Sequence, residues 1–199
     1  ADETIVSAAS CTTNAVVPPL ARIHAEYGIE SGHIESVHAF TNDQNLTDNY
    51  HPKARRNRSA SMNMVITSTG AATAAAKALP DLAGKLTASA IRVPTPNVSL
   101  AILNLNLARP TTREEINEFL RGTAMEGDMQ DQIDWTAAPD VVSIDLVGND
   151  HASIIDATAT QTDGTKAVVY AWYDNEYGYS AQCIRLMAQM IGLNRPSLP

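Results

Sequence analysis

The sequence has 199 residues, of which 44% are hydrophobic and 18% charged, and its formal net charge is −8. This composition is typical of a globular protein with a buried core. The acidic balance disfavours nucleic-acid binding, which needs a basic surface. No apolar run approaches the ~20 residues that span a bilayer, and residues 1–3 lack the basic start of a secretory signal. With two cysteines, no disulfide framework is predicted, and we expect a cytoplasmic protein.

The first elements predicted along the chain are a short strand and a long helix. Residues 4–9 are apolar enough for a buried strand, and Ser10 is a candidate N-cap for a helix beginning at Cys11. Apolar side chains at helical spacing continue until Gly28, which is a natural stop. The pair Pro18-Pro19 predicts a kink or a delayed start of regular helix.

A strand, a long loop and a second helix are predicted next. Residues 34–40 alternate as a strand that carries His38 on one face. Residues 41–63 are polar and partly basic, which predicts a long ordered loop. Residues 60–79 are rich in alanine and methionine and predict a helix, although Gly70 offers an alternative helix start.

The remaining half of the chain is dominated by predicted strands. A capping-box sequence at residues 111–115 predicts a helix to about Met125, and residues 180–191 predict a final helix. The succession of elements predicts an α+β fold: a mainly antiparallel mixed sheet with helices packed on one face. The strands are predicted at 86–93, 98–107, 141–147, 152–159 and 166–173.

Common nucleotide-binding and metal-binding patterns do not occur in the sequence. There is no G-x-G-x-x-G and no G-x-x-x-x-G-K-[ST], so the chain shows no dinucleotide or phosphate loop of the usual kind. Its histidines and cysteines lack metal-ligand spacing, and we predict no metal site.

Cys11 and His38 form the candidate catalytic pair. A thiol at a helix N-terminus feels the positive end of the helix dipole, and this favours the reactive thiolate. An imidazole beside it would serve as the acid or base. If the predicted strands before and after the first helix are neighbours, the two side chains can meet. Taken on spacing alone, a buried structural thiol and an ordinary strand histidine explain the residues equally well.

The segments around this pair resemble the active-site sequences of glyceraldehyde-3-phosphate dehydrogenases. ASCTTN and SVHAFTNDQ are followed, in the family's order, by RRNRSA, STGAA, ALPDLAGKL, RVPTPNVS and WYDNEYGYS. The resemblance implies that Cys11 attacks an aldehyde to form a thiohemiacetal and then an acyl-thioester, with His38 as the base. The oxidation would be phosphorylating, as in glycolysis and gluconeogenesis, with glyceraldehyde 3-phosphate and inorganic phosphate as the substrates.

The resemblance also implies further binding residues. Taken singly, these residue types fit ordinary structural roles as well as they fit ligand binding. Those roles are a helix cap, a surface arginine, a solvated basic loop and a turn that ends a strand. In the family's pattern, Asn175 and Tyr179 match residues that hold the nicotinamide end of NAD or NADP. The implied substrate-binding and phosphate-binding residues are Ser10, Thr12, Thr41, Arg56, Thr69, Gly70 and Arg92.

One departure from the family pattern concerns domain organisation. In the family a Rossmann-type domain precedes the nucleophile, so residues 1–175 correspond to the catalytic domain. Residues 176–199 correspond to a terminal helix and tail that dock onto the cofactor domain. We therefore expect this chain to be inactive by itself and to belong to a homo-oligomer, a tetramer in the family. Ala15 stands where the family usually has a second cysteine, which the chemistry does not need.

Three alternatives remain at this stage. One is a dehydrogenase for a related phospho-aldehyde such as erythrose 4-phosphate. Another is a non-catalytic fragment that acts as an assembly or binding module. The third is a Cys–His hydrolase, although no peptide or ester pocket is recognisable in the sequence.

Overall fold

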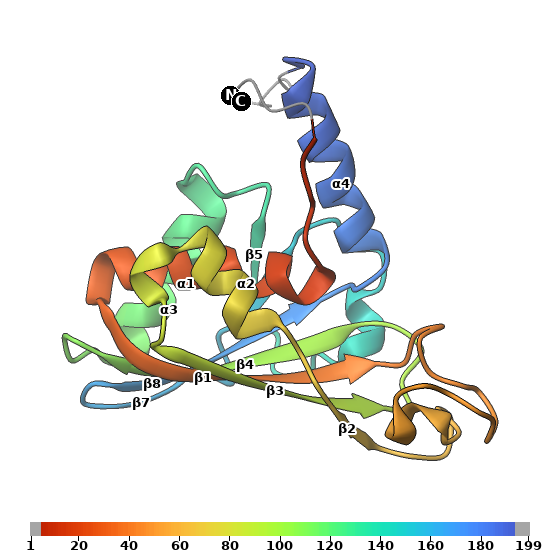
Figure 1. Ribbon diagram of the computed structural model, residues 1–199. Helices are drawn as coiled ribbons and strands as arrows, with labels where there is room; N and C mark the ends of the chain where they lie inside the picture. Colours follow the sequence, from red (N-terminus) through yellow and green to blue (C-terminus); the bar gives the residue numbers. More distant parts are fainter. Residues whose placement is uncertain (1–4, 194–199) are drawn as a thin grey trace.

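A mixed sheet of eight strands is the frame of the computed structural model, which describes residues 5–193 (Figure 1). The strand order is β2-β3-β1-β4-β8-β6-β5, and β7 pairs with β8. The pairs β1–β3 and β5–β6 are parallel, whereas the other neighbours are antiparallel. The strands are β1 Ile29–Ala39, β2 Val65–Thr67, β3 Leu86–Val93, β4 Ser99–Leu107, β5 Ile133–Thr136, β6 Ser153–Asp156, β7 Gln161–Asp163 and β8 Lys166–Tyr173.

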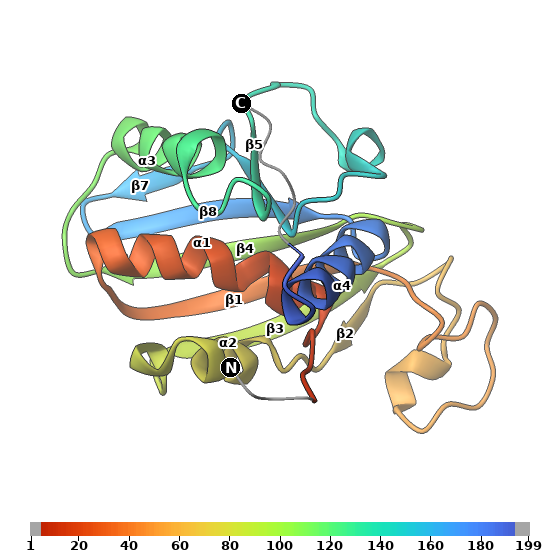
Figure 2. The same ribbon diagram turned by 90° about the horizontal axis from the view of Figure 1, so that it is seen from above.

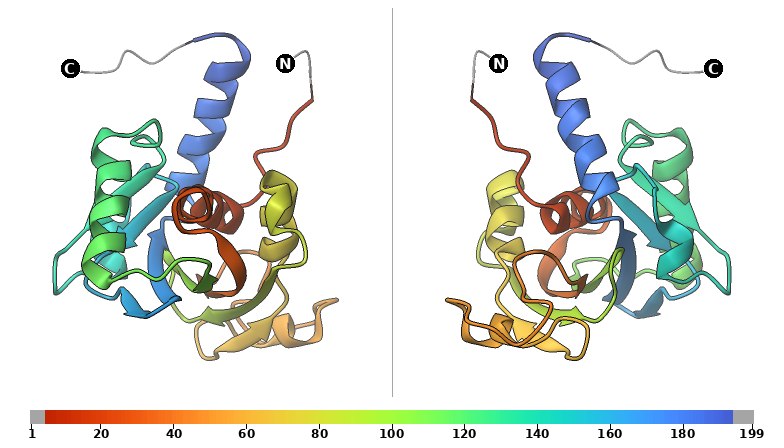
Figure 3. Two further views of the ribbon diagram at one scale, coloured as in Figure 1. Left: turned by 90° about the vertical axis from the view of Figure 1, so that its left-hand side faces the viewer. Right: turned by 90° about the vertical axis from the view of Figure 1, so that its right-hand side faces the viewer.

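Helices cover one face of this sheet, so the predicted α+β fold is confirmed. α1, α2 and α3 lie over that face, whereas α4 stands away from the sheet (Figures 1 and 3). Within the described residues, no helix has the length and apolarity needed to cross a bilayer. The α-helices are α1 Cys11–Tyr27, α2 Ala71–Ala78, α3 Arg113–Glu126 and α4 Tyr177–Met190, and the short 3-10 helices are η1 Ala54–Asn57, η2 Pro80–Leu82 and η3 Ser143–Leu146.

α1 is the central helix, and it begins and ends where the sequence predicts. The Ser10 hydroxyl accepts the Thr13 N–H at 3.1 Å, and Gly28 ends the helix at φ 67°. Leu20 and Ile23 are fully buried on its inner side, within the core formed with the sheet. The predicted delay at Pro18-Pro19 is wrong, because the helix starts at Cys11 and continues through both prolines. Both rings are buried, and this packing offsets the two lost backbone donors.

Three other predictions of local structure are wrong. Residues 5–9 form no strand, and Ile5 is 89% exposed; Thr4 lies outside the described residues. Residues 60–70 are not helical, because β2 runs through 65–67 and the helix begins only after its N-cap Gly70. The predicted strand at 141–147 is wrong, because Ser143–Leu146 form the 3-10 helix η3, where Ile144 is 70% exposed. β5 and β7 were not predicted; both are short, at four and three residues.

The C-terminal helix α4 projects away from the sheet (Figure 3). Ile184, Met187 and Met190 are 55%, 58% and 47% exposed. The helix is held at its base, where Gln182 Nε2 donates to the Asp150 carbonyl at 2.8 Å. The expectation that residues 176–199 dock onto a cofactor domain stays a prediction, and residues 194–199 lie outside the described part of the chain.

Candidate active site

The fold brings Cys11 and His38 together. Cys11 is the first residue of α1, His38 lies near the end of β1, and Cys11 Sγ is 3.5 Å from His38 Nε2. His38 Nδ1 lies 2.6 Å from the Ala39 carbonyl oxygen. Because a carbonyl can only accept, Nδ1 carries the ring proton and Nε2 presents its lone pair to the thiol. The imidazole is therefore placed to take the proton from Cys11.

Burial keeps both members of the pair neutral at rest. It raises the pKa of Cys11 above its ordinary value of 9.0, and hydrogen bonds from Thr12 and the charge of Arg92 only partly oppose it. Burial also lowers the pKa of His38 below 6.5, and the charges of Arg92 and Arg56 lower it further. The thiolate expected from the helix N-terminus stays a prediction, because desolvation by burial opposes it in this chain. Desolvation is the largest effect, and the proton would move to His38 as the thiol attacks.

Tyr173, at the end of β8, connects the elements around this pair, and sequence reasoning did not single it out. Its hydroxyl lies 2.9 Å from Thr12 Oγ1 and 3.0 Å from Ser36 Oγ. Its ring meets the His38 ring edge-on, with centroids 5.9 Å apart. Burial raises the pKa of Tyr173 to about 12, so the phenol stays protonated near neutral pH. Tyr173 thus packs against the imidazole of His38 and forms a hydrogen bond with the first turn of α1.

Replacing Tyr173 with phenylalanine is expected to lower the free energy of unfolding by about 1–3 kcal/mol. The reason is that the buried hydroxyls of Thr12 and Ser36 would lose the phenol as their hydrogen-bond partner. Denaturant unfolding measures this loss. Tyr170→Phe, on the opposite face of β8, is the matched control and is expected to cost less. Equal losses in the two variants would contradict this role for Tyr173.

Arg92 supplies positive charge beside the pair. In the parallel register of β1 and β3, Arg92 is the direct neighbour of His38 and lies on the same face of the sheet. Its side chain is largely buried, and Nη1 donates to Thr41 Oγ1 at 2.6 Å. Among residues 5–193 its hydrogen-bond partner is this neutral hydroxyl, so the guanidinium keeps most of its charge available for an anion. The alternative of a surface arginine is wrong.

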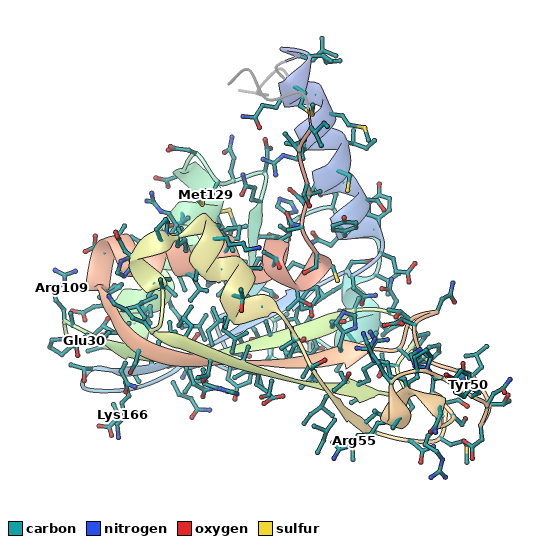
Figure 4. The ribbon with its side chains drawn as sticks, viewed as in Figure 1. Glu30, Tyr50, Arg55, Arg109, Met129 and Lys166 are labelled. Carbon is teal, nitrogen blue, oxygen red and sulfur yellow. The ribbon has the colours of Figure 1, made fainter. Side chains whose placement is uncertain are left out.

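Arg56 is also buried, but its guanidinium is already engaged. It forms an ion pair with Asp43, and its Nε and Nη2 donate to Thr67 Oγ1 at 3.1 and 2.9 Å. Burial lowers its pKa, and the nearby charge of Arg92 adds to this effect. The loop 41–63 is ordered as expected, and Figure 4 shows Tyr50 and Arg55 at its outer side. An anion would reach Arg56 only in competition with Asp43.

The remaining phosphate candidates lie at helix N-termini. Ser10 Oγ is used by the cap of α1, and Thr69 Oγ1 accepts the Ala71 N–H at 3.2 Å in the first turn of α2. Gly70 is the N-cap of α2, and a Cβ built on it would meet nothing within 4 Å. α1 and α2 lie side by side and both begin toward the end of the sheet where β1 and β3 end (Figure 2). Unpaired N–H groups at such ends favour anions.

Asn175 and Tyr179 lie on the turn after β8 and in the first turn of α4. They line an open hollow of about 550 Å³ together with Glu176, Tyr177 and Ser180. Asn175 Oδ1 accepts the Ser99 hydroxyl at 2.8 Å, whereas its buried Nδ2 has no hydrogen-bond partner among the described residues. Tyr179 donates to the Ala9 carbonyl at 3.3 Å. A buried amide donor without a partner fits a ligand that brings a carbonyl oxygen.

Metal ligands are not clustered in the described residues. Among residues 5–193, no group of three or more His, Cys, Asp or Glu side chains is arranged to hold a metal ion. The residues beside the candidate site that sequence reasoning missed carry hydroxyl groups: Tyr173, Ser36 and Ser99. Only the strand register could have indicated them, since Ser99 and Tyr173 are direct partners across β4 and β8.

Covalent nucleophilic catalysis uses a thiol and an imidazole in contact. Here that pair lies at a helix N-terminus, beside a buried guanidinium. A sequence model described as "Glyceraldehyde 3-phosphate dehydrogenase, C-terminal domain" matches residues 10–175. The chain therefore belongs to the glyceraldehyde-3-phosphate dehydrogenase family, which is a family of oxidoreductases.

Relatives with this name align over nearly the whole chain. The chain is 62% identical over 199 residues, its full length, to a "Glyceraldehyde-3-phosphate dehydrogenase-like protein" of Pseudomonas aeruginosa strain UCBPP-PA14, and covers 43% of that protein. It is 46% identical over 191 residues, 96% of its length, to glyceraldehyde-3-phosphate dehydrogenase of Zymomonas mobilis, and covers 56% of that enzyme. It is 43% identical over 189 residues, 94% of its length, to glyceraldehyde-3-phosphate dehydrogenase 1 of Bacillus subtilis, and covers 56% of that enzyme. The chain thus spans about half the length of these relatives.

Proposed function

We propose that this chain is the catalytic part of an enzyme that converts glyceraldehyde 3-phosphate and inorganic phosphate to 1,3-bisphosphoglycerate. The contact of 3.5 Å between Cys11 Sγ and His38 Nε2, beside buried Arg92, is the observation that carries the proposal. The sulfur adds to the aldehyde carbon while His38 takes the thiol proton, giving a thiohemiacetal. Transfer of hydride to the bound nicotinamide nucleotide, with the hydroxyl proton passing to His38, would leave an acyl-thioester. Phosphate would then cleave this thioester to the acyl phosphate as the sulfur departs.

The chain's own residues supply binding and charge for these steps. The protonated imidazole and Arg92 would stabilise the oxyanion, an effect commonly worth ~3–4 kcal/mol per donor. When bound, NAD or NADP supplies the hydride acceptor. The unpartnered Asn175 Nδ2 fits its carboxamide, with Tyr179 lining the same hollow. The residues proposed to hold the two phosphate groups are Ser10, Thr12, Thr41, Arg56, Thr69, Gly70 and Arg92.

Assembly and setting are part of the proposal. We infer a cytoplasmic homo-oligomer of glycolysis or gluconeogenesis, in which a cofactor domain joins this chain and restores activity. Exposed apolar side chains support subunit contacts at the loop 41–63 and β2: Met62, Met64 and Ile66 are 79%, 75% and 61% exposed. Such a cluster on one edge of the sheet is suited to a protein interface.

The test is an assay of the full-length protein with glyceraldehyde 3-phosphate and either NAD or NADP, with and without inorganic phosphate. We expect reduction of the nucleotide to depend on phosphate and an acyl phosphate product to form. Erythrose 4-phosphate in the same assay separates the alternative dehydrogenase by its kcat/KM. A full-length protein without phosphate-dependent activity toward either aldehyde would contradict the proposal and favour an assembly role.

A further inference from the structure

Ser99 occupies a junction between the catalytic strand β1 and the turn that carries Asn175. It is the first residue of β4 and is only 1% exposed. Its Oγ accepts the Ala39 N–H at 3.0 Å and lies 2.8 Å from Asn175 Oδ1. The carbonyl of the same Ala39 accepts the Nδ1–H of His38. One hydroxyl therefore connects the backbone that orients the base with the amide proposed to meet the cofactor.

The hydrogen bonds at this junction indicate which way the Asn175 amide faces. A backbone N–H can only donate, so Ser99 Oγ is the acceptor toward Ala39. The hydroxyl proton is donated to Asn175 Oδ1 at 2.8 Å, and the Tyr173 side chain is a further hydrogen-bond partner of Ser99. With Oδ1 engaged, the amide presents Nδ2 on its other side, where this buried atom has no partner among the described residues. The Ser99 hydroxyl therefore favours the orientation in which Nδ2 faces away from β4.

The backbone around Ser99 shows that this junction is strongly constrained. Val98, which is β-branched and buried, has φ 63°, a left-handed conformation that β-branched residues rarely adopt. On its other side, Asn97 Nδ2 donates to Asp174 Oδ2 at 3.1 Å. Asp174 Oδ1 in turn accepts the Glu176 N–H at 2.9 Å. The strained residue thus lies between two side chains that both bind the turn after β8.

We propose that Ser99 is a positioning residue that fixes the Asn175 amide as a hydrogen-bond donor toward the carbonyl oxygen of a nicotinamide carboxamide. The inference rests on the proposed function, because it concerns the same cofactor site. It predicts a specific recognition chemistry: the chain reads the carbonyl of the carboxamide rather than its NH₂ group. Ser99 itself need not touch the cofactor.

The experiment measures equilibrium binding of two probes to the full-length protein. One is its preferred nicotinamide nucleotide, and the other is the 3-acetylpyridine analogue, which keeps the carbonyl but lacks the NH₂. The wild type should bind both with similar Kd. Ser99→Ala should weaken nucleotide binding about tenfold, the effect of one misdirected hydrogen bond. The variant should also discriminate against the analogue, because a released amide can turn its oxygen to the NH₂ group.

Two further comparisons separate positioning from a general structural effect. Ser153→Ala removes another buried strand hydroxyl, one that has no hydrogen-bond partner among the described residues, and should leave both Kd values unchanged. In an Asn175→Ala background, Ser99→Ala should cause no further loss of affinity, because the amide it positions is gone.

Each result bears on the inference in a defined way. Loss of affinity in Ser99→Ala that persists in the Asn175→Ala background would overturn it, as would unchanged binding of both probes by Ser99→Ala. A wild type that binds neither probe would overturn the proposed function and this inference with it. A wild type that binds the nucleotide but discriminates against the analogue would overturn the inference alone.

Discussion

Replacing Cys11 with serine in the full-length protein is expected to reduce kcat/KM by roughly 10⁴- to 10⁶-fold, the scale seen when a catalytic nucleophile is removed. A hydroxyl of similar size would keep the packing at the start of α1. It is far harder to deprotonate than a thiol, and His38 with its lowered pKa is too weak a base to activate it. Steady-state nucleotide reduction measures the loss, and mass spectrometry should detect an acyl-enzyme only with the wild type.

Cys183→Ser is the matched control, because Cys183 is the other cysteine of the chain and lies on α4. It should retain activity and the acyl-enzyme signal. If Cys11→Ser keeps more than a hundredth of the wild-type kcat/KM, a covalent role for Cys11 is untenable, and another group must carry the reaction.

Replacing His38 with asparagine is expected to lower kcat by roughly 10²- to 10⁴-fold, the usual contribution of a general acid or base. The amide can still donate to the Ala39 carbonyl, so the strand end should hold its shape while the proton acceptor is lost. His33→Asn is the control on the same strand. Its ring lies on the opposite face of β1, 2.7 Å from the Thr87 and Ser89 hydroxyls, and its loss should leave kcat nearly unchanged.

The pH dependence gives a second measure of His38. Its pKa is lowered, so the neutral base persists as pH falls through 6.5 and is lost only at lower pH. The acidic limb of kcat/KM should therefore have its midpoint below 6.5 in the wild type and should be absent in His38→Asn. An acidic limb centred above 6.5, or one that survives the substitution, would contradict the assignment of His38 as the base.

Local chemistry along the chain was sufficient to predict several elements. Ser10 and Gly28 bound α1 because a side-chain cap and a positive-φ glycine act within a few residues. The same holds for α3, where Thr112 and Glu115 form the predicted capping box. β8 matches its predicted bounds because its inward-facing residues alternate with outward-facing ones along the strand. The family, too, could be recognised from the ordered sequence segments.

Local sequence pattern gave wrong predictions where an apolar segment has no neighbouring strand to pair with. The segments 5–9 and 141–147 contain strand-forming residues, yet neither pairs with the sheet, and Ile5 and Ile144 are 89% and 70% exposed. A strand needs a neighbour to satisfy its backbone, and pairing is a tertiary property that no short window contains. For the same reason residues 65–67 join the sheet as β2 although their surroundings are typical of a helix.

The sequence by itself determined which residue types are available for the chemistry, and the caps that place Cys11 at the start of a helix. Only the tertiary structure decided that Sγ meets His38 Nε2, that Arg92 lies beside them and that burial keeps the pair neutral. It also decided that Tyr173 and Ser99 join the site from strands far along the chain. The physical reason is that desolvation and hydrogen-bond direction depend on everything packed around a group, whereas helix caps and side-chain alternation depend on neighbours in sequence.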